Sequence, residues 1–195
     1  MRPLAAIVLA AGASRRLGQP KQLLLRHGET LIGRAIRLAT EAGAAPVIAV
    51  LGAHSDRIFR AVAFDKTIPV VNDQWEQGIA GSIHAGLNAL DAAAPAASSA
   101  LILGCDQPLL TVAHLRTLIE GFSAQTVPPI VASSYAGVLG IPAIFPRFVF
   151  TELLDLRGDT GARAVLMQPN RPVVAIPLQG GEVDIDLPAD IERLE

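Results

Sequence analysis

Short apolar runs alternate with longer amphipathic segments along most of this chain. The runs have the length and composition of buried strands, and polar or glycine-containing residues bound them. They lie at Ala6–Leu9, Pro46–Leu51, Ile68–Val71, Ala100–Leu103, Ile130–Ala132, Ala143–Phe145, Val173–Ile176 and Val183–Ile185.

The segments between these runs have helical periodicity, and Thr30, Ser82 and Thr111 are the expected N-caps. We expect helices from Thr30 to near Gly43, Ser55 to Ala63, Ser82 to Leu90, Thr111 to Phe122, Phe148 to Leu156, Gly161 to Met167 and from Pro188 onward. Loops are expected at residues 74–81, 91–99 and 125–129, and a turn at 140–142.

This alternation predicts an α/β fold with a largely parallel sheet. A chain of 195 residues can bury a full-sized core, and its sequence contains no internal repeat and no domain boundary. We therefore expect residues 1–195 to form one domain.

Composition narrows the function classes. The net charge of −2 does not indicate a basic surface for nucleic-acid binding. No apolar run approaches the roughly 20 residues that span a bilayer. The first residues imitate a signal peptide, but the apolar run is short and is followed by Gly12 and two arginines. The single cysteine excludes an internal disulfide and suits a reducing cytoplasm.

The first strand runs into a stretch of small and basic residues. Residues 10–14 (Ala-Ala-Gly-Ala-Ser) would let backbone N–H groups approach a phosphate closely. Arg15, Arg16 and Lys21 add the positive charge that a triphosphate needs. The stretch therefore predicts a nucleotide-binding loop.

Acidic residues near two strand ends are candidates for a metal site. Asp106 directly follows an apolar strand, at the edge where open α/β sheets bind ligands, and a carboxylate there suits Mg²⁺. A turn or cap role before Pro108 is the alternative. Asp184 and Asp186 alternate on a predicted strand and so share one face; we prefer Asp186 as the second metal carboxylate, since it lies nearer the strand end.

Other polar residues have simpler interpretations. Residues 158–163 form an N-cap or bring Arg163 to an anionic acceptor. Trp75 is expected to pack, Cys105 to be a small buried residue, and the four histidines to lie on surfaces or loops. The P-loop pattern, the dinucleotide-binding glycine pattern and the Gly-x-Ser-x-Gly elbow of hydrolases are all missing from the sequence.

Together these residues resemble nucleotidyltransferases with an LAAG-x-x-x-R-x-G-x-x-K signature, and more narrowly the molybdenum cofactor cytidylyltransferases. The signature is matched by Leu9, Ala10, Ala11, Gly12, Arg16, Gly18 and Lys21. The narrower likeness rests on Gln22-Leu23-Leu24, Asn72, Trp75, Gly78, Cys105-Asp106-Gln107-Pro108, Gly140, Pro142, Phe145, Gly158-Asp159, Gly161-Ala162-Arg163, Asp184-Ile185-Asp186 and Pro188.

The resemblance implies a three-layer Rossmann-like sandwich with a mostly parallel mixed sheet, of the nucleotide-diphospho-sugar transferase type. It places the nucleotide on the loop, including Arg15, with Gly78 and Ser82 completing the base and ribose pocket. Asp106 and Asp186 would hold Mg²⁺, and Arg16 and Lys21 would neutralise phosphate charge.

The implied reaction is transfer of CMP from CTP to the terminal phosphate of molybdopterin cofactor, with release of pyrophosphate. Guanylyl-transferring relatives tend to have Leu-Ala-Gly-Gly, so Ala11 favours CTP. Relatives often have a histidine where this chain has Ile141, and a serine-containing pair where it has Ala80-Gly81. Both positions lie where the acceptor or the base would be recognised.

Two other functions remain open. One is nucleotidyl transfer, from CTP or GTP, to another phosphorylated acceptor. The other is a non-catalytic carrier that delivers the cofactor to a molybdenum hydroxylase or its insertion chaperone. A carrier has no use for a metal site, so the acidic and basic residues favour an enzyme, one that acts in the cytoplasm without nucleic-acid or membrane partners.

Overall fold

A computed structural model describes residues 4–124, 127–169 and 171–194, and it contains a seven-stranded mixed sheet. The strand order is β5-β4-β1-β6-β8-β7-β9. The strands are β1 (Leu4–Ala10), β4 (Val47–Leu51), β5 (Thr67–Val71), β6 (Ser99–Gly104), β7 (Ile130–Tyr135), β8 (Val138–Pro146) and β9 (Val173–Pro177). A small separate hairpin pairs β2 (Leu25–Arg26) with β3 (Glu29–Thr30).

Strand direction confirms the predicted mostly parallel sheet. β1 pairs in parallel with both β4 and β6, whereas β8 runs antiparallel to β6 and β7. The reversal of β8 brings its first residues to the edge where β1 and β6 end. Gly140 and Ile141 therefore lie near Gly104. They were predicted to form a turn but belong to β8. The turn is instead at Ala136 and Gly137, where both residues have positive φ.

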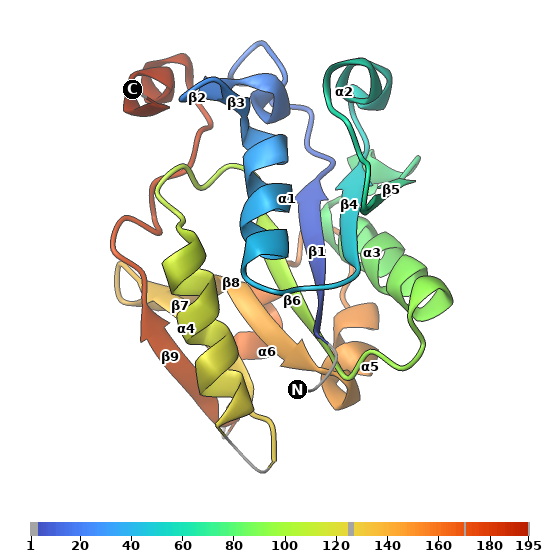
Figure 1. The fold of residues 1–195 in the computed structure, drawn as a ribbon, viewed down its shortest axis with the longest axis vertical. Helices are drawn as coiled ribbons and strands as arrows, with labels where there is room; N and C mark the ends of the chain where they lie inside the picture. Colours follow the sequence, from blue (N-terminus) through green and yellow to red (C-terminus); the bar gives the residue numbers. More distant parts are fainter. Residues whose placement is uncertain (1–3, 125–126, 170, 195) are drawn as a thin grey trace.

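Helices cover both faces of the sheet, which gives three layers (Figure 1). Alternate β1 residues point to opposite faces: Ala6 and Val8 pack under α1 (Leu31–Glu41) and α4 (Val112–Ser123), and Ile7 packs under α3 (Ile79–Ala93). The second face is completed by two short helices, α5 (Phe150–Leu154) and α6 (Arg163–Leu166). The remaining helical segments are α2 (Ser55–Ala61), η1 (Lys21–Leu23), η2 (Trp75–Gln77), η3 (Arg147–Val149) and η4 (Pro188–Leu194).

Two of the three predicted N-caps are confirmed. The Thr30 hydroxyl accepts a hydrogen bond from the Gly33 backbone N–H, and the Thr111 hydroxyl accepts one from the His114 N–H. Ser82 is not a cap: α3 begins at Ile79, one turn earlier, and Ser82 is buried inside the helix. The predicted loop at residues 74–81 therefore includes a 3-10 turn and the start of α3. Gln125, the first residue of the predicted 125–129 loop, lies outside the described residues.

The predicted strand at Val183–Ile185 is wrong, because this segment pairs with no strand of the described chain. Ile185 instead packs in a small cluster with Leu17, Leu31 and Leu194. This cluster attaches the C-terminal segment beside β2 and β3, at the upper end of Figure 1. The Asp190 carboxylate accepts from the backbone N–H groups of Asp186 and Leu187 and so starts η4.

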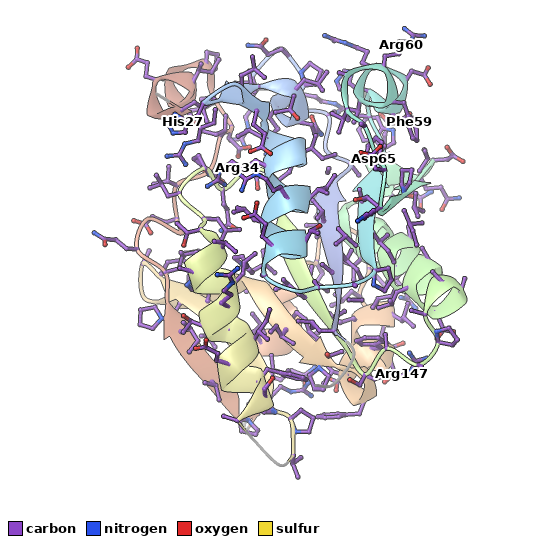
Figure 2. The ribbon with its side chains drawn as sticks, viewed as in Figure 1. His27, Arg34, Phe59, Arg60, Asp65 and Arg147 are labelled. Atoms are coloured by element: carbon purple, nitrogen blue, oxygen red, sulfur yellow. The ribbon has the colours of Figure 1, made fainter. Side chains whose placement is uncertain are left out.

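Side chains also connect the layers at this end of the molecule. Arg34 extends from α1 toward the segment that precedes α4 (Figure 2), and its guanidinium donates to the Leu110 carbonyl. His114 is buried rather than exposed, contrary to prediction: its Nε2 lies 2.8 Å from Ser133 Oγ, which donates to the Pro142 carbonyl. Burial lowers the pKa of this imidazole.

The contact between α3 and the sheet leaves no room for a side chain at Gly86. A Cβ there would lie 2.5 Å from Ile7 Cγ2 and 3.1 Å from Val50 Cγ2. We predict that Gly86→Ala lowers the free energy of unfolding by about 1–2 kcal/mol in urea titrations, although alanine is the better helix former.

Gly121→Ala is the matched control, because a Cβ at this position in α4 meets Val131 Cγ1 at an ordinary 3.6 Å. It should be neutral or stabilising by up to about 1 kcal/mol. A Gly86→Ala protein as stable as the wild type would contradict this description of the helix–sheet contact.

Candidate active site

A cavity of about 400 Å³ opens where β1 and β6 end. In doubly wound sheets this edge is the usual ligand site. Most of the sequence-predicted site residues line it: Leu9, Ala10, Ala11, Gly12, Arg15, Lys21, Gly78, Ser82 and Asp106. Arg16 and Asp186 do not line the cavity but adjoin it through Lys21, whereas Gly18 serves the loop as a positive-φ turn residue.

Lys21 lies between two carboxylates that come from distant parts of the chain. Its Nζ is 2.7 Å from Asp106 Oδ2 and 2.9 Å from Asp186 Oδ1. The lysine side chain is only 15% exposed, so this ammonium group is poorly screened by water. The predicted convergence of Asp106 and Asp186 on one point is therefore present in the fold.

The charges in this cluster shift one another's protonation. Burial disfavours the charged form of Lys21, but Asp106 and the hydrogen bonds to both carboxylates outweigh it and raise the pKa of the ammonium. The hydrogen bond from Lys21 lowers the pKa of the Asp186 carboxyl. Both shifts favour the charged forms of Lys21 and Asp186.

The two arginines of the loop have different partners. Arg16 Nη2 lies 2.6 Å from Asp186 Oδ2 and extends the cluster toward solvent. Arg15 pairs with Glu76 at 2.8 Å, and its guanidinium carbon is 5.8 Å from the centre of the Trp75 ring. Trp75, which the sequence predicted to pack, is therefore part of the cavity wall beside Arg15.

Gln22 fixes the shape of the loop, a role that the sequence analysis missed. This side chain is fully buried, and its Nε2 donates to the carbonyls of Ala10 and Gly12 at 2.8 and 2.7 Å. A hydroxyl completes the support, because Ser14 Oγ accepts from the Lys21 backbone N–H. The available signal was the position of a polar residue directly after Lys21, within a short apolar segment.

The start of α3 is joined to the loop that follows α5. The Ala80 backbone N–H donates to the Gly158 carbonyl at 3.1 Å. Gly78 has φ 109°, and a Cβ there would collide with the Gly158 backbone. Ser82 has a supporting role, since its Oγ accepts from the Asn72 amide at 3.1 Å.

Asp184 and Asp186 do not share a strand face, because residues 183–185 are not a strand. The chain turns at residues 179–182, where Gly180 has φ 73°, and then passes the site as an irregular segment. Partial burial, and then the nearby charges of Asp186 and Asp106, raise the pKa of the Asp184 carboxyl. Asp186 is the carboxylate that contacts Lys21, with its Oδ1 2.9 Å from Lys21 Nζ.

Cys105 is buried beside Asp106, as expected. Burial and the Asp106 charge raise the pKa of its thiol to about 12. The sulfur is therefore a protonated packing atom at neutral pH and has no nucleophilic character.

The donor set fits a divalent cation that substrate phosphates would share. Among residues 4–124, 127–169 and 171–194, no group of three or more His, Cys, Asp or Glu side chains is arranged to hold a metal. Asp106 and Asp186 nevertheless direct one oxygen each at the same cation, Lys21 Nζ. Mg²⁺ commonly takes one or two carboxylates and completes its shell with phosphate oxygens and water.

The fold and this site define a nucleotidyltransferase. A family model described as the MobA-like NTP transferase domain matches residues 6–173, and the chain belongs to that family. Within the described part of the chain, no helix is long and apolar enough to cross a membrane.

This chain is similar in sequence to relatives that are named for different functions. The chain is 31% identical over 168 residues to nicotine blue oxidoreductase of Paenarthrobacter nicotinovorans, a match that covers 83% of this chain and 80% of that protein. It is 38% identical over 115 residues to a probable molybdenum cofactor guanylyltransferase of Opitutus terrae, with 59% and 54% covered.

Solved structures confirm the fold. The chain is similar to Rv0371c of Mycobacterium tuberculosis, with a TM-score of 0.85, 32% identity, and coverage of 99% of this chain and 97% of that one. A manganese complex of the same protein matches with a TM-score of 0.80, 30% identity and coverage of 98% and 97%.

The hydrogen bonds of Gln22 lead to a stability prediction. Gln22→Leu keeps the size of the side chain but leaves two loop carbonyls without their donor, so we predict a loss of about 2 kcal/mol in the free energy of unfolding. Urea titration measures it. Gln19→Leu, at an exposed position of the same loop, should change stability by less than about 0.5 kcal/mol. Equal stabilities for the two variants would contradict the bracing role of Gln22.

Proposed function

We propose that the protein transfers CMP from CTP to the terminal phosphate of molybdopterin cofactor and releases pyrophosphate, with Mg²⁺ as the metal. The observation that carries this proposal is the position of Lys21 between Asp106 and Asp186, at the wall of the cavity that the LAAG loop forms. The relative that is a probable molybdenum cofactor guanylyltransferase supports the acceptor, and the manganese complex of Rv0371c supports a divalent metal.

In the proposed reaction an oxygen of the acceptor phosphate forms a bond to the α-phosphorus of CTP. The bond between that phosphorus and the bridging oxygen breaks, and its electron pair leaves with pyrophosphate. No covalent intermediate on the protein is needed, so the residues act by positioning and by charge.

Asp106 and Asp186 would hold the metal, which supplies Lewis-acid polarisation of a phosphoryl oxygen when bound. Lys21 stays cationic at any physiological pH, since the pKa of its ammonium is raised. When the nucleotide is bound, Lys21 and Arg16 would neutralise the negative charge on the β- and γ-phosphates and on the leaving group. Arg16 is suited to this because 70% of its side chain is exposed.

The base pocket favours a pyrimidine. Ala11 is buried against Gly52, where a Cβ would approach the Ala11 Cβ to 2.9 Å and the Trp75 Cβ to 2.7 Å. Ala11 lines the cavity and packs closely on Gly52, and the proposal assigns to its methyl group the limit on the space for a purine. CTP is therefore the proposed nucleotide and GTP the weaker substrate.

Two other functions follow from the same site. A different phosphorylated acceptor, such as a sugar phosphate, would use the same nucleotide half. A carrier that hands molybdenum cofactor to a molybdenum hydroxylase or its chaperone would not need the Lys21 cluster, which favours catalysis. Delivery of the product to such an enzyme, in the reducing compartment that a single cysteine suits, belongs to the proposal as well.

The proposal predicts that pyrophosphate release requires Mg²⁺, molybdopterin cofactor and a nucleotide, and that it is fastest with CTP. GTP should support a rate at least about tenfold lower, which corresponds to about 1.4 kcal/mol of discrimination. A coupled pyrophosphate assay with each nucleotide, and with sugar phosphate, methylerythritol phosphate or phospholactate as acceptors, separates the alternatives. Absence of pyrophosphate with CTP and the cofactor would exclude the proposed reaction.

Asp106→Asn tests the site within the same assay. It removes one negative charge at similar size, so we expect the turnover number to fall at least about a hundredfold. Asp73→Asn, at an exposed position before η2, is the control and should keep wild-type turnover. Substantial activity in the Asp106 variant would remove this carboxylate from the metal site.

A further inference from the structure

The segment that carries Asp186 has few attachments before it reaches the site. Its first is the Leu178 backbone N–H, which donates to the Ser134 carbonyl at 2.9 Å. Its next strong attachment in the apolar core is Ile185, which is fully buried. Between them the chain turns at Gly180 and belongs to no strand. Asp186 itself is bonded to Lys21, Arg16 and Asp190, and the path of the chain toward it depends on what holds residues 179–184.

Gln107 holds this stretch at its midpoint. The side chain is 8% exposed, and its Nε2 donates to the Gly181 carbonyl at 3.0 Å and to the Ile141 carbonyl at 3.1 Å. One amide group thus joins the segment to β8. Because Gln107 directly follows Asp106 in the chain, the same short stretch supplies one carboxylate and fixes the segment that supplies the other.

An aromatic ring also contacts this part of the segment. A Cβ on Gly181 would lie 2.5 Å from Tyr135 Cδ1, so the ring packs directly on this backbone. The Tyr135 hydroxyl donates to the Ile141 carbonyl at 3.1 Å, the acceptor that Gln107 also uses. Gly181 therefore contacts both an amide donor and an aromatic ring, and there is no space for a side chain at this position.

We infer that Gln107 is a positioning residue that holds Asp186 opposite Asp106 through the backbone of Gly181. The inference rests on the proposed function, since the two carboxylates are its metal ligands. Misplacement of catalytic groups by about 1 Å is costly, and partners behind metal ligands commonly contribute 10–100-fold to metal affinity.

Gln107→Leu tests the inference at constant side-chain size. Hydrogen exchange at the amides of Gly181 and Val183, which are hydrogen-bonded within the segment, should accelerate about tenfold, while β1 amides stay unchanged. The dissociation constant for Mn²⁺, measured by electron paramagnetic resonance with the unreactive α,β-methylene analogue of CTP, should rise at least about tenfold.

Two further variants sharpen the result. Gln179→Leu lies on the same segment but is exposed, so its exchange rates and Mn²⁺ affinity should match the wild type. Gly181→Ala disturbs the segment through the Tyr135 ring and should reproduce both effects of Gln107→Leu. If the Gln107→Leu protein does not fold, the Gly181→Ala protein tests whether disturbing this segment weakens Mn²⁺ binding.

The outcomes separate the inference from the proposed function. Unchanged exchange in the segment, or faster exchange with unchanged Mn²⁺ affinity, overturns the positioning role while CTP turnover by the wild type stands. Wild-type Mn²⁺ binding that weakens in both variants, without any pyrophosphate release, supports the positioning role and rejects the proposed reaction. If the wild-type protein binds no Mn²⁺, both the positioning role of Gln107 and the proposed reaction are rejected.

Discussion

The attraction between one buried ammonium and two carboxylates is the interaction on which this site depends. Asp106 follows the core strand β6, whereas Asp186 comes from a C-terminal segment outside the sheet, and Lys21 contacts both. Two carboxylates this close repel each other unless a cation lies between them. The lysine supplies that cation in the free protein. In the proposed complex, a divalent metal that also binds the phosphates would supply the positive charge between the carboxylates.

The loop that carries Lys21 has its own constraint. Gln22 directs its amide into the loop and bonds two carbonyls there, so the backbone of Ala10–Gly12 is set by a side chain that follows the lysine. Phosphate binding by backbone groups requires such a preformed shape, since ordering the loop at the moment of binding would reduce affinity. Gln22 bonds backbone carbonyls of the loop, and Gln107 bonds the backbone of the segment that leads to Asp186.

Local patterns were sufficient for most of the fold. Continuous apolar runs located the sheet strands, and the threonine caps of α1 and α4 were correct because each hydroxyl accepts from a backbone N–H three residues further along the chain. Ser82 failed because Asn72, distant in the chain, engages it inside α3. Residues 183–185 alternate like a strand, yet Ile185 is buried by Leu17 and Leu31 rather than by sheet neighbours. Tertiary contacts of this kind leave no periodic signal, and the roles of Gln22 and Gln107 were missed for the same reason.

The central claim is that Asp106 and Asp186 form the metal site that Lys21 spans in the free protein. The most direct test is a crystal structure with Mn²⁺ and the α,β-methylene analogue of CTP, in which anomalous scattering locates the metal. The account predicts an anomalous peak within about 2.5 Å of an oxygen of each carboxylate, with Lys21 Nζ moved onto the phosphates. A peak bound elsewhere, or Lys21 still bridging both carboxylates beside bound nucleotide, would contradict it.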